Sequence, residues 1–157
     1  MVWFKNKKEQ MRELRIKSLV PQIKRIIEES LQIINSTKNI KTGIGRFETI
    51  KTMLQRLLNE IPSGEVEKYL PVFSLNNQKV TSYDDLKLID DAKNKWIKEM
   101  VFENIERERK KADVLTDKKL KNQQLKKALK EALNGIEFIP DDVYLKTKIT
   151  EIESEIN

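Results

Sequence analysis

The chain has 157 residues and a formal net charge of +6, from 31 basic and 25 acidic residues, and it contains neither Cys nor His. These two absences exclude Cys/His zinc sites, thiol redox chemistry, haem with an axial His, and Ser-His-Asp or Cys-His catalysis within the chain. Four Gly and four Pro are few for this length, which favours long helices over the frequent turns of all-β folds.

The first third of the chain predicts two helices before the first glycine. The opening residues 1–5 lack the apolar stretch of a secretory signal, so we expect none. A helix is predicted over residues 5–19, and Pro21 then interrupts it, sitting in the first turn of the next helix. That second helix should end within residues 35–39, where Ser, Thr and Asn offer the backbone competing hydrogen bonds. Its apolar stripe consists of Ile23, Ile26, Ile27, Leu31 and Ile34.

The next helix is predicted to start between Asn39 and Gly45, with Thr42 as its cap, and to end near Glu60. Its stripe is formed by Phe47, Ile50, Leu54, Leu57, Leu58 and Ile61. Residues 65–81 carry the weakest pattern of the chain. A short β-hairpin is one interpretation of them, but there is no second sheet for it to join, so we expect an ordered loop.

A long helix is predicted after this loop, capped by Thr81 or Ser82 and ending near Ala112. Four carboxylates near its start raise the question of a metal ion. One helix supplies at most two converging oxygens, so ion pairs along the helix explain the pattern better and we expect no metal site. These carboxylates are Asp84, Asp85, Asp90 and Asp91.

Two further helices complete the prediction. Thr116 is expected to cap a helix over residues 117–134, and Asn134-Gly135 to stop it. The inner face of that helix would hold Leu120, Leu125, Ala128, Leu129, Ala132 and Leu133. The last helix opens at residues 140–142, and its 4-3-4 spacing predicts packing on the body of the protein or on a second copy. Its stripe is Leu145, Ile149, Ile152 and Ile156.

Together these patterns predict an all-α bundle of five or six helices with at least one long helix. We expect a single domain over residues 1–157, with residues 62–81 as an ordered loop between the helical halves. No segment has the ~18 uninterrupted apolar residues of a membrane-spanning helix.

The stretch STKNIKTGIGRF at residues 36–47 is a candidate anion site, since glycine and a helix N-terminus can expose N–H groups to a phosphate. It lacks the ending of a P-loop, and Glu48 stands where a dinucleotide fingerprint has its third glycine. A corner between two helices, with the glycines allowing close contact, is therefore the favoured interpretation. The speculative anion ligands are Thr42, Gly43, Arg46, Lys38 and Lys41. An enzyme acting on a phosphorylated substrate would need Arg46 beside a base such as Glu48.

Basic residues cluster between positions 107 and 130 and could follow a phosphate backbone. The cluster has no interleaved aromatic residue and little Arg, and acidic residues partly neutralise it, so a solvated lysine face is the competing interpretation. The residues predicted to bind nucleic acid are Arg107, Arg109, Lys110, Lys111, Lys119, Lys126 and Lys130.

Trp3 and Phe4 precede three lysines, a grouping that suits a peripheral membrane contact. The same two residues can instead attach the first helix to the core, which is the favoured interpretation.

The segments ESLQIINSTKN at residues 29–39 and KKADVLTDKK at 110–119, with Arg46-Phe47 between them, resemble a family of uncharacterised all-helical proteins of Gram-positive bacteria and their prophages. The resemblance implies a helical fold and a bacterial cytoplasmic setting, and no activity. The chain departs from the family at Gly43-Ile44-Gly45, where bulky aromatic residues are usual.

The aliphatic helix faces and the lack of catalytic side chains predict a non-catalytic interaction module. It would bind a protein partner or self-associate through an apolar helix face, without a cofactor, in the cytoplasm. Sequence-independent nucleic-acid binding through residues 107–130 is the alternative hypothesis.

Overall fold

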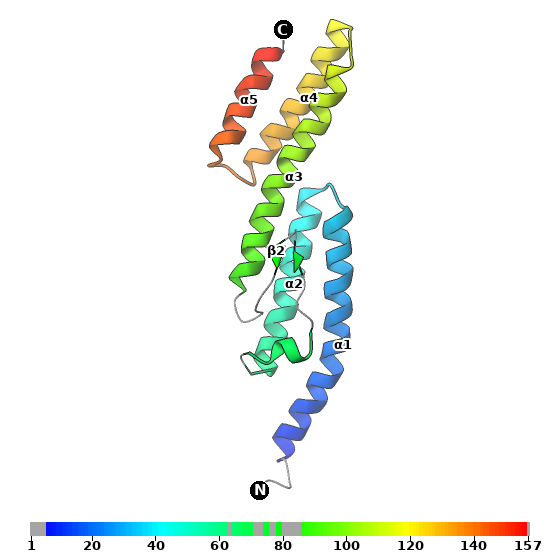
Figure 1. Cartoon of the computed structure of the whole chain (residues 1–157), viewed down its shortest axis with the longest axis vertical. Coiled ribbons are helices and arrows are strands. Elements are labelled where there is room, and N and C mark those ends of the chain that lie inside the picture. The colour runs from blue at the N-terminus through cyan, green and yellow to red at the C-terminus, as the bar shows by residue number, and fades with distance from the viewer. Residues whose placement is uncertain (1–5, 63, 71–73, 76–77, 80–85, 157) are drawn as a thin grey trace. The chain divides into compact units, whose positions relative to one another are not determined.

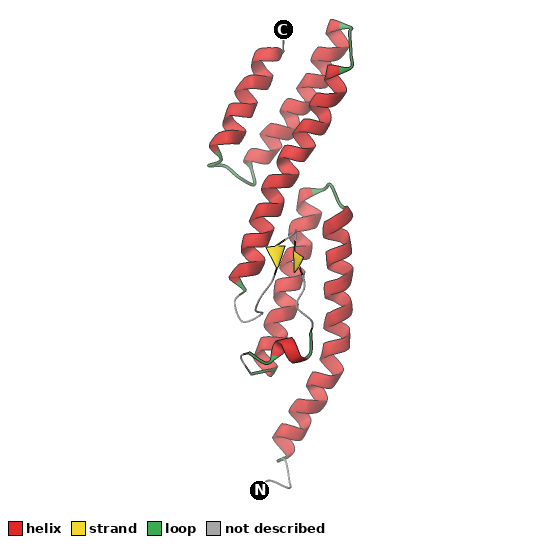
Figure 2. Ribbon diagram, viewed as in Figure 1, coloured by secondary structure: helices red, strands yellow, loops and turns green. Residues whose placement is uncertain are grey.

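A computed structural model describes residues 6–62, 64–70, 74–75, 78–79 and 86–156 of the chain. Figure 2 shows that helices dominate these residues, which confirms the all-α prediction. The five helices of the described residues are α1 Lys7–Ser36, α2 Ile40–Glu60, α3 Lys87–Asp113, α4 Lys118–Ile136 and α5 Val143–Glu155. With 30 residues in α1 and 27 in α3, the expectation of at least one long helix is also confirmed.

Backbone contacts divide the chain into two compact units, Met1–Lys93 and Asn94–Asn157. The division falls within α3, so each unit includes part of this helix. The single domain expected from the sequence stays a prediction.

In the first unit, α1 and α2 run antiparallel and side by side (Figure 1). The predicted apolar stripes form their contact, because residues spaced three and four apart share one face of a helix. The buried apolar residues of the two helices are Ile16, Ile23, Ile27, Ile34, Phe47, Ile50, Leu54 and Leu57.

Helix α1 passes through Pro21 without a break, so the prediction of two separate helices is wrong here. Proline removes one backbone hydrogen bond from a helix interior and commonly bends it. Pro21 is exposed, so water can solvate the carbonyl that loses its partner, while Ile16 and Ile23 are buried on either side of it. Burial along the whole of this face keeps the helix continuous.

The corner between α1 and α2 is capped by Asn39, not by Thr42 as predicted. The Asn39 side chain accepts a hydrogen bond from the Thr42 N–H at 3.0 Å, and the Thr37 hydroxyl accepts one from the Asn39 N–H at 3.1 Å. Helix α2 therefore starts at Ile40 and contains both glycines of the motif. Gly43 is buried, whereas Gly45 has open space where a Cβ would stand, so only Gly43 fits the prediction of close helix contact.

The segment after α2 forms more structure than the expected loop. A 3₁₀ turn at Val66–Lys68 buries Val66, and two short strands, β1 Ser74–Leu75 and β2 Gln78–Lys79, pair antiparallel. Ser74 lies opposite Lys79 and Leu75 opposite Gln78. This pairing is the one expected of the hairpin that the sequence left as an alternative. The predicted cap at Thr81 or Ser82 lies outside the described residues.

The second unit contains most of α3 together with α4 and α5. Helix α5 packs within this unit through Leu145, Ile149 and Ile152, as its seam predicted. Helix α4 packs through small residues and one leucine, namely Leu125, Ala128, Ala132 and Gly135.

Two leucines predicted to face inward from α4 are exposed instead. Leu120 is 51% exposed and Leu133 is 52% exposed. At ~100° per residue both lie about a quarter-turn or more around the helix from the midpoint between Ala128 and Ala132. The narrow buried face of α4 therefore excludes them.

Gly135 is a packing residue and not the predicted helix stop. Helix α4 continues to Ile136, and a Cβ at Gly135 would lie 2.5 Å from Val101 Cγ1 of α3 and 3.5 Å from Leu145 Cδ2 of α5. The absence of a side chain lets the α4 backbone approach both neighbouring helices. This close approach sets the rotation of α4 about its own axis.

The caps of α4 and α5 are both aspartates. Asp117 accepts a hydrogen bond from the Leu120 N–H at 2.9 Å, so the predicted cap at Thr116 is wrong by one residue. Asp142 accepts one from the Leu145 N–H at 2.8 Å, which confirms that residues 140–142 open the last helix.

Substitution of the two helical glycines should have opposite effects. Gly135→Ala should destabilise the protein by about 1–2 kcal/mol, because overpacking against Val101 outweighs the better helix propensity of alanine. Gly45→Ala should stabilise it by about 0.5–1 kcal/mol, since its helical position has room for a methyl group. Urea unfolding measures both. In a Val101→Ala background the penalty of Gly135→Ala should disappear, and an unchanged penalty would contradict the packing explanation.

Candidate functional site

Helix α4 concentrates positive charge. The single acidic residue within Lys118–Ile136 is Glu131, which follows all the lysines of the helix. These lysines are Lys118, Lys119, Lys121, Lys126, Lys127 and Lys130.

Three of the six lysines lie on the face of α4 opposite its buried face. At ~100° per residue, Lys119, Lys126 and Lys130 fall within about 40° of one another around the helix. They lie roughly half a turn from the direction of Ala128 and Ala132, and all three are exposed. We call Lys119, Lys126 and Lys130 the α4 basic face.

No α4 lysine side chain forms an ion pair or hydrogen bond with a described residue. Several other cations of the same unit are paired: Lys98 Nζ lies 3.1 Å from Asp142 Oδ2, and Lys111 Nζ lies 3.3 Å from Glu108 Oε1. Several cations of α3 thus meet a carboxylate, whereas none of the six α4 lysines forms an ion pair with a described residue.

The four residues of α3 that were predicted to bind nucleic acid differ in their exposure to solvent and in their ion pairs. Lys110 is exposed, and Lys111 pairs with Glu108. Arg107 is half-buried, and its Nη1 has no hydrogen-bond acceptor among the described residues. Arg109 is held by carboxylates.

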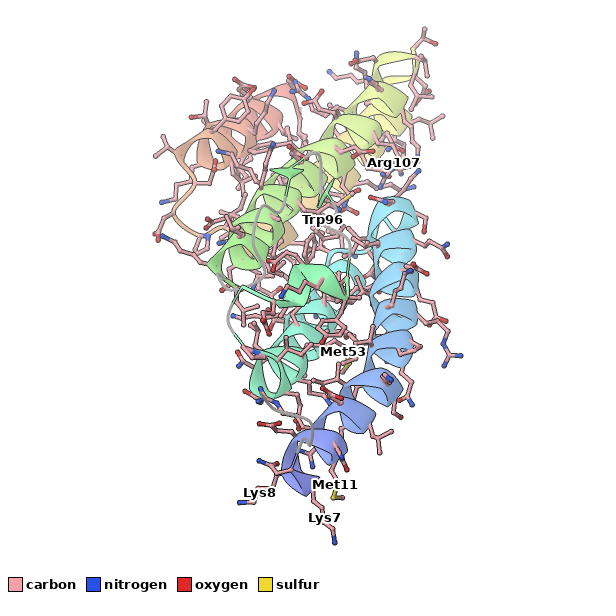
Figure 3. The ribbon with its side chains drawn as sticks, turned by 60° about the horizontal axis from the view of Figure 1, so that its bottom comes forward. Lys7, Lys8, Met11, Met53, Trp96 and Arg107 are labelled. Carbon is pink, nitrogen blue, oxygen red and sulfur yellow. The ribbon has the colours of Figure 1, made fainter. Side chains whose placement is uncertain are left out.

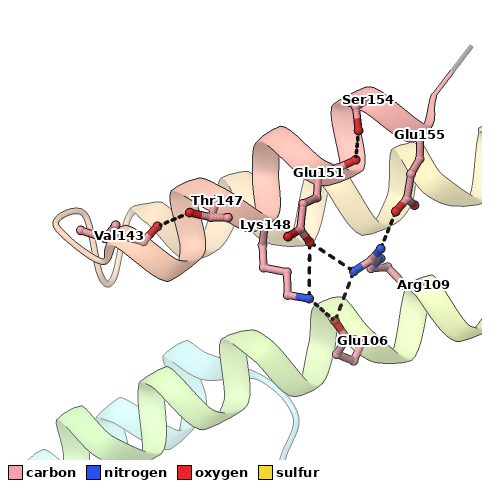
Figure 4. A network of polar contacts seen from close by, with 8 residues as sticks. All are labelled: Glu106, Arg109, Val143, Thr147, Lys148, Glu151, Ser154 and Glu155. Carbon is pink, nitrogen blue, oxygen red and sulfur yellow. Dashed lines mark hydrogen bonds and ion pairs between the residues drawn. The ribbon is translucent and has the colours of Figure 1, made fainter.

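Arg109 belongs to an ionic network between α3 and α5 (Figure 4). Its Nη2 lies 2.5 Å from Glu155 Oε1, and its Nη1 lies 3.6 Å from Glu106 Oε1 and 3.9 Å from Glu151 Oε2. Lys148 Nζ lies 3.4 Å from Glu106 Oε1 and 3.6 Å from Glu151 Oε2, so Lys148 bridges these two glutamates. The Arg109 side chain is only 19% exposed, so it stabilises the docking of α5 and is not available to a ligand.

A second polar contact, between α3 and α4, was not predicted. Gln124 Nε2 donates to Glu108 Oε2 at 2.6 Å and to the Glu108 backbone oxygen at 3.1 Å. Burial would raise the pKa of Glu108, but the hydrogen bonds from Gln124 and Lys111 outweigh this effect and lower it. This contact orients α4 with its lysines outward. Gln124 lies in the polar run Asn122-Gln123-Gln124, and nothing in the sequence distinguishes it from its neighbours as the residue that makes this contact.

The candidate anion site at the α1–α2 corner has its backbone donors already engaged. The Thr42 N–H donates to Asn39 Oδ1, and the Gly43 N–H donates to the Asn39 carbonyl at 3.1 Å. Lys38 and Lys41 are exposed, and Arg46 is half-exposed one turn into α2. The Thr42 and Gly43 N–H groups are therefore used to cap α2 and do not point to a free anion site.

Glu48, the base considered for an enzyme at this corner, pairs with Lys93, whose Nζ lies 2.7 Å from Glu48 Oε1. Asp90 likewise pairs with Lys51 at 2.9 Å, and the hydrogen bond that Lys51 donates to Asp90 raises the pKa of Lys51. Within the part of the chain that the structure describes, no three or more acidic side chains gather as they would around a metal ion.

None of the described helices has the length and apolar character needed to cross a bilayer. The membrane contact proposed for Trp3 and Phe4 lies outside the described residues.

No protein-family model matches the chain, and no curated protein or solved structure is significantly similar to it. The resemblance to helical proteins of Gram-positive bacteria and prophages stays a prediction.

The cap of α5 makes the second unit sensitive to acid. Burial would raise the pKa of Asp142, but hydrogen bonds from the Leu145 N–H and the Lys98 ammonium outweigh it and lower the pKa. A carboxylate with a lowered folded-state pKa contributes stability above its unfolded pKa. This contribution is lost as the pH falls through the folded pKa.

Asp142→Asn should therefore reduce stability at pH 7 by about 0.5–1 kcal/mol, because Asn keeps the cap but loses the charge. The difference from the parent protein should shrink as the pH falls from the usual Asp value of about 4, which applies to the unfolded chain, through the lowered pKa of folded Asp142. Urea unfolding at pH 7, 5 and 3 measures the effect. Asp141→Asn, at an exposed neighbouring position, is the control of equal charge. A constant difference across this pH range would contradict the prediction.

Proposed function

We propose that the protein is a non-catalytic helical interaction module that binds nucleic acid through the α4 basic face, without sequence specificity. The observation behind this proposal is the set of six lysines on α4 without an ion pair to a described residue. Such a surface attracts phosphates by releasing condensed counterions, a gain that needs no fixed geometry.

Repulsion between neighbouring lysines of α4 supports a polyanionic partner. Lys126 and Lys130 are separated by one turn, and like charges at this spacing destabilise a helix by about 0.2–0.5 kcal/mol. A bound phosphate backbone would remove this repulsion. The α4 lysines are also bound to no other group in the described structure, so a ligand would not have to displace an existing ion pair.

The composition of α4 also supports the lack of sequence specificity. The helix contains no Arg, which is the usual reader of guanine in the major groove. Lysine binds phosphate as a flexible point charge and so contributes affinity without recognising a base.

The combined variant Lys119→Gln, Lys126→Gln and Lys130→Gln should weaken binding of a mixed-sequence oligonucleotide. Removing three phosphate contacts should flatten the slope of log K against log salt concentration by about 2–3. Fluorescence anisotropy at several salt concentrations measures the slope. Helicity by circular dichroism should be unchanged, because all three side chains are exposed.

The control is Lys17→Gln, Lys24→Gln and Lys146→Gln, which removes equal charge from exposed lysines elsewhere. It should change the slope much less. Equal loss in both variants would assign binding to net charge alone and count against the α4 basic face. No binding of any nucleic acid at low salt would refute the proposal.

Self-association or binding to a protein is the second candidate, and the outer face of α1 favours it. Most apolar stripes of the helices are buried within the two units, but Met11 is 60% exposed and Leu14 is 65% exposed. Both lie on the side of α1 away from Ile16, and Figure 3 shows Met11 at the end of the helix beside Lys7 and Lys8. This pair is the apolar helix face left for a partner on α1.

Sedimentation velocity at tens of micromolar tests this candidate. If α1 mediates self-association, the parent protein should sediment as an oligomer, and Met11→Gln with Leu14→Gln should sediment as a monomer. The double variant should keep the parent stability, because both side chains are largely exposed. A strictly monomeric parent protein would remove the homo-oligomer version.

A further inference from the structure

We infer that the ligand of the α4 basic face is double-stranded nucleic acid, in preference to a single strand. This inference rests on the proposed function and specifies its substrate class. Three properties of α4 point to a duplex: the spacing of its lysines, its lack of stacking side chains, and the contacts that hold it against its neighbours.

The lysine spacing suits a polymer of high charge density. At ~1.5 Å per residue, Lys119 and Lys126 are about 10.5 Å apart along the helix axis, and Lys126 and Lys130 about 6 Å apart. Over the resulting length of about 16.5 Å, a duplex presents roughly ten phosphate charges. Each lysine can therefore reach a phosphate without any rearrangement of the duplex.

The α4 surface offers nothing on which unpaired bases could stack. Single-strand binding proteins gain about 1–3 kcal/mol per base from aromatic side chains, and α4 contains none. The exposed aromatic residue of α5, Tyr144, is engaged within the protein: its ring lies 5.0 Å from that of Phe102, and Lys148 Nζ lies 5.6 Å from its centre. A single strand would thus bind through phosphates alone.

Packing and hydrogen bonds hold helix α4 against its neighbours, which favours a ligand whose phosphates are already ordered. The close approach of Gly135 to Val101 and the Gln124–Glu108 hydrogen bonds fix its orientation. A duplex brings its phosphates to such a surface already ordered, whereas a single strand must lose conformational freedom to follow it. Release of counterions is also greater for the duplex, about 0.9 per phosphate contact against about 0.7 for a single strand.

The test compares fluorescein-labelled ligands by anisotropy with the full-length protein at 50 mM salt. The ligands are a 20-base-pair mixed-sequence DNA duplex, an RNA duplex of equal length, and a 20-nucleotide thymidine strand. At least one duplex should bind on the order of tenfold more tightly than the strand. The variant Lys119→Gln, Lys126→Gln and Lys130→Gln should lose most of this preference. A second duplex of scrambled sequence should bind equally well.

The possible failures can be told apart. Binding of the thymidine strand as tight as that of both duplexes, or tighter, would overturn the duplex inference and leave the proposed function standing. A preference for the duplexes that persists in the lysine variant would also overturn it, since another surface would then be responsible. Absence of binding to all the ligands would overturn both.

Discussion

The close approach of the α4 backbone to its neighbours is the constraint on which the second unit depends. A side chain at Gly135 would collide with Val101 of α3, and it would also contact Leu145 of α5. Ala128 and Ala132 continue the same narrow face, and both are fully buried. Because so little of the circumference of α4 is buried, its rotation about its own axis is closely defined. The hydrogen bonds from Gln124 to Glu108 also restrict the rotation of α4 about its own axis. With this rotation, Lys119, Lys126 and Lys130 face solvent together.

The second consequence is a separation of charge between neighbouring helices. Arg109 of α3 and Lys148 of α5 lie among glutamates and stabilise the docking of α5. The lysines of α4 have no such counter-charges among the described residues. Basic residues that are close in the sequence therefore have different roles: Arg109 is structural, and Lys119 is available to a ligand. Composition alone cannot make this distinction, because it depends on which helix each residue faces.

The errors of the sequence-based predictions share a physical origin. Asn39 caps α2 in place of Thr42, and Asp117 caps α4 in place of Thr116. Ser, Thr, Asn and Asp are all suitable N-cap residues. Which of two neighbouring candidates becomes the cap depends on the backbone dihedral angles, and the residue types do not determine these angles. Gly135 has the local signature of a helix stop, yet it lies inside α4, because contact with two other helices outweighs the local preference. At Pro21, too, tertiary packing outweighs the local preference, since burial of α1 on both sides of the proline keeps the helix continuous.

The sequence by itself determined the helical class, the approximate extent of α2 to α5, and the buried stripes of α1, α2 and α5. Helical periodicity and the scarcity of Gly and Pro act over neighbouring residues, so they can be read from the order of residues alone. Only the tertiary structure decided that Leu120 and Leu133 are exposed, that Arg109 is bound by carboxylates, and that three lysines of α4 form one face. These properties depend on how one helix is rotated against another. Contacts between residues far apart in the chain, such as Gly135 with Val101 and Arg109 with Glu155, set that rotation.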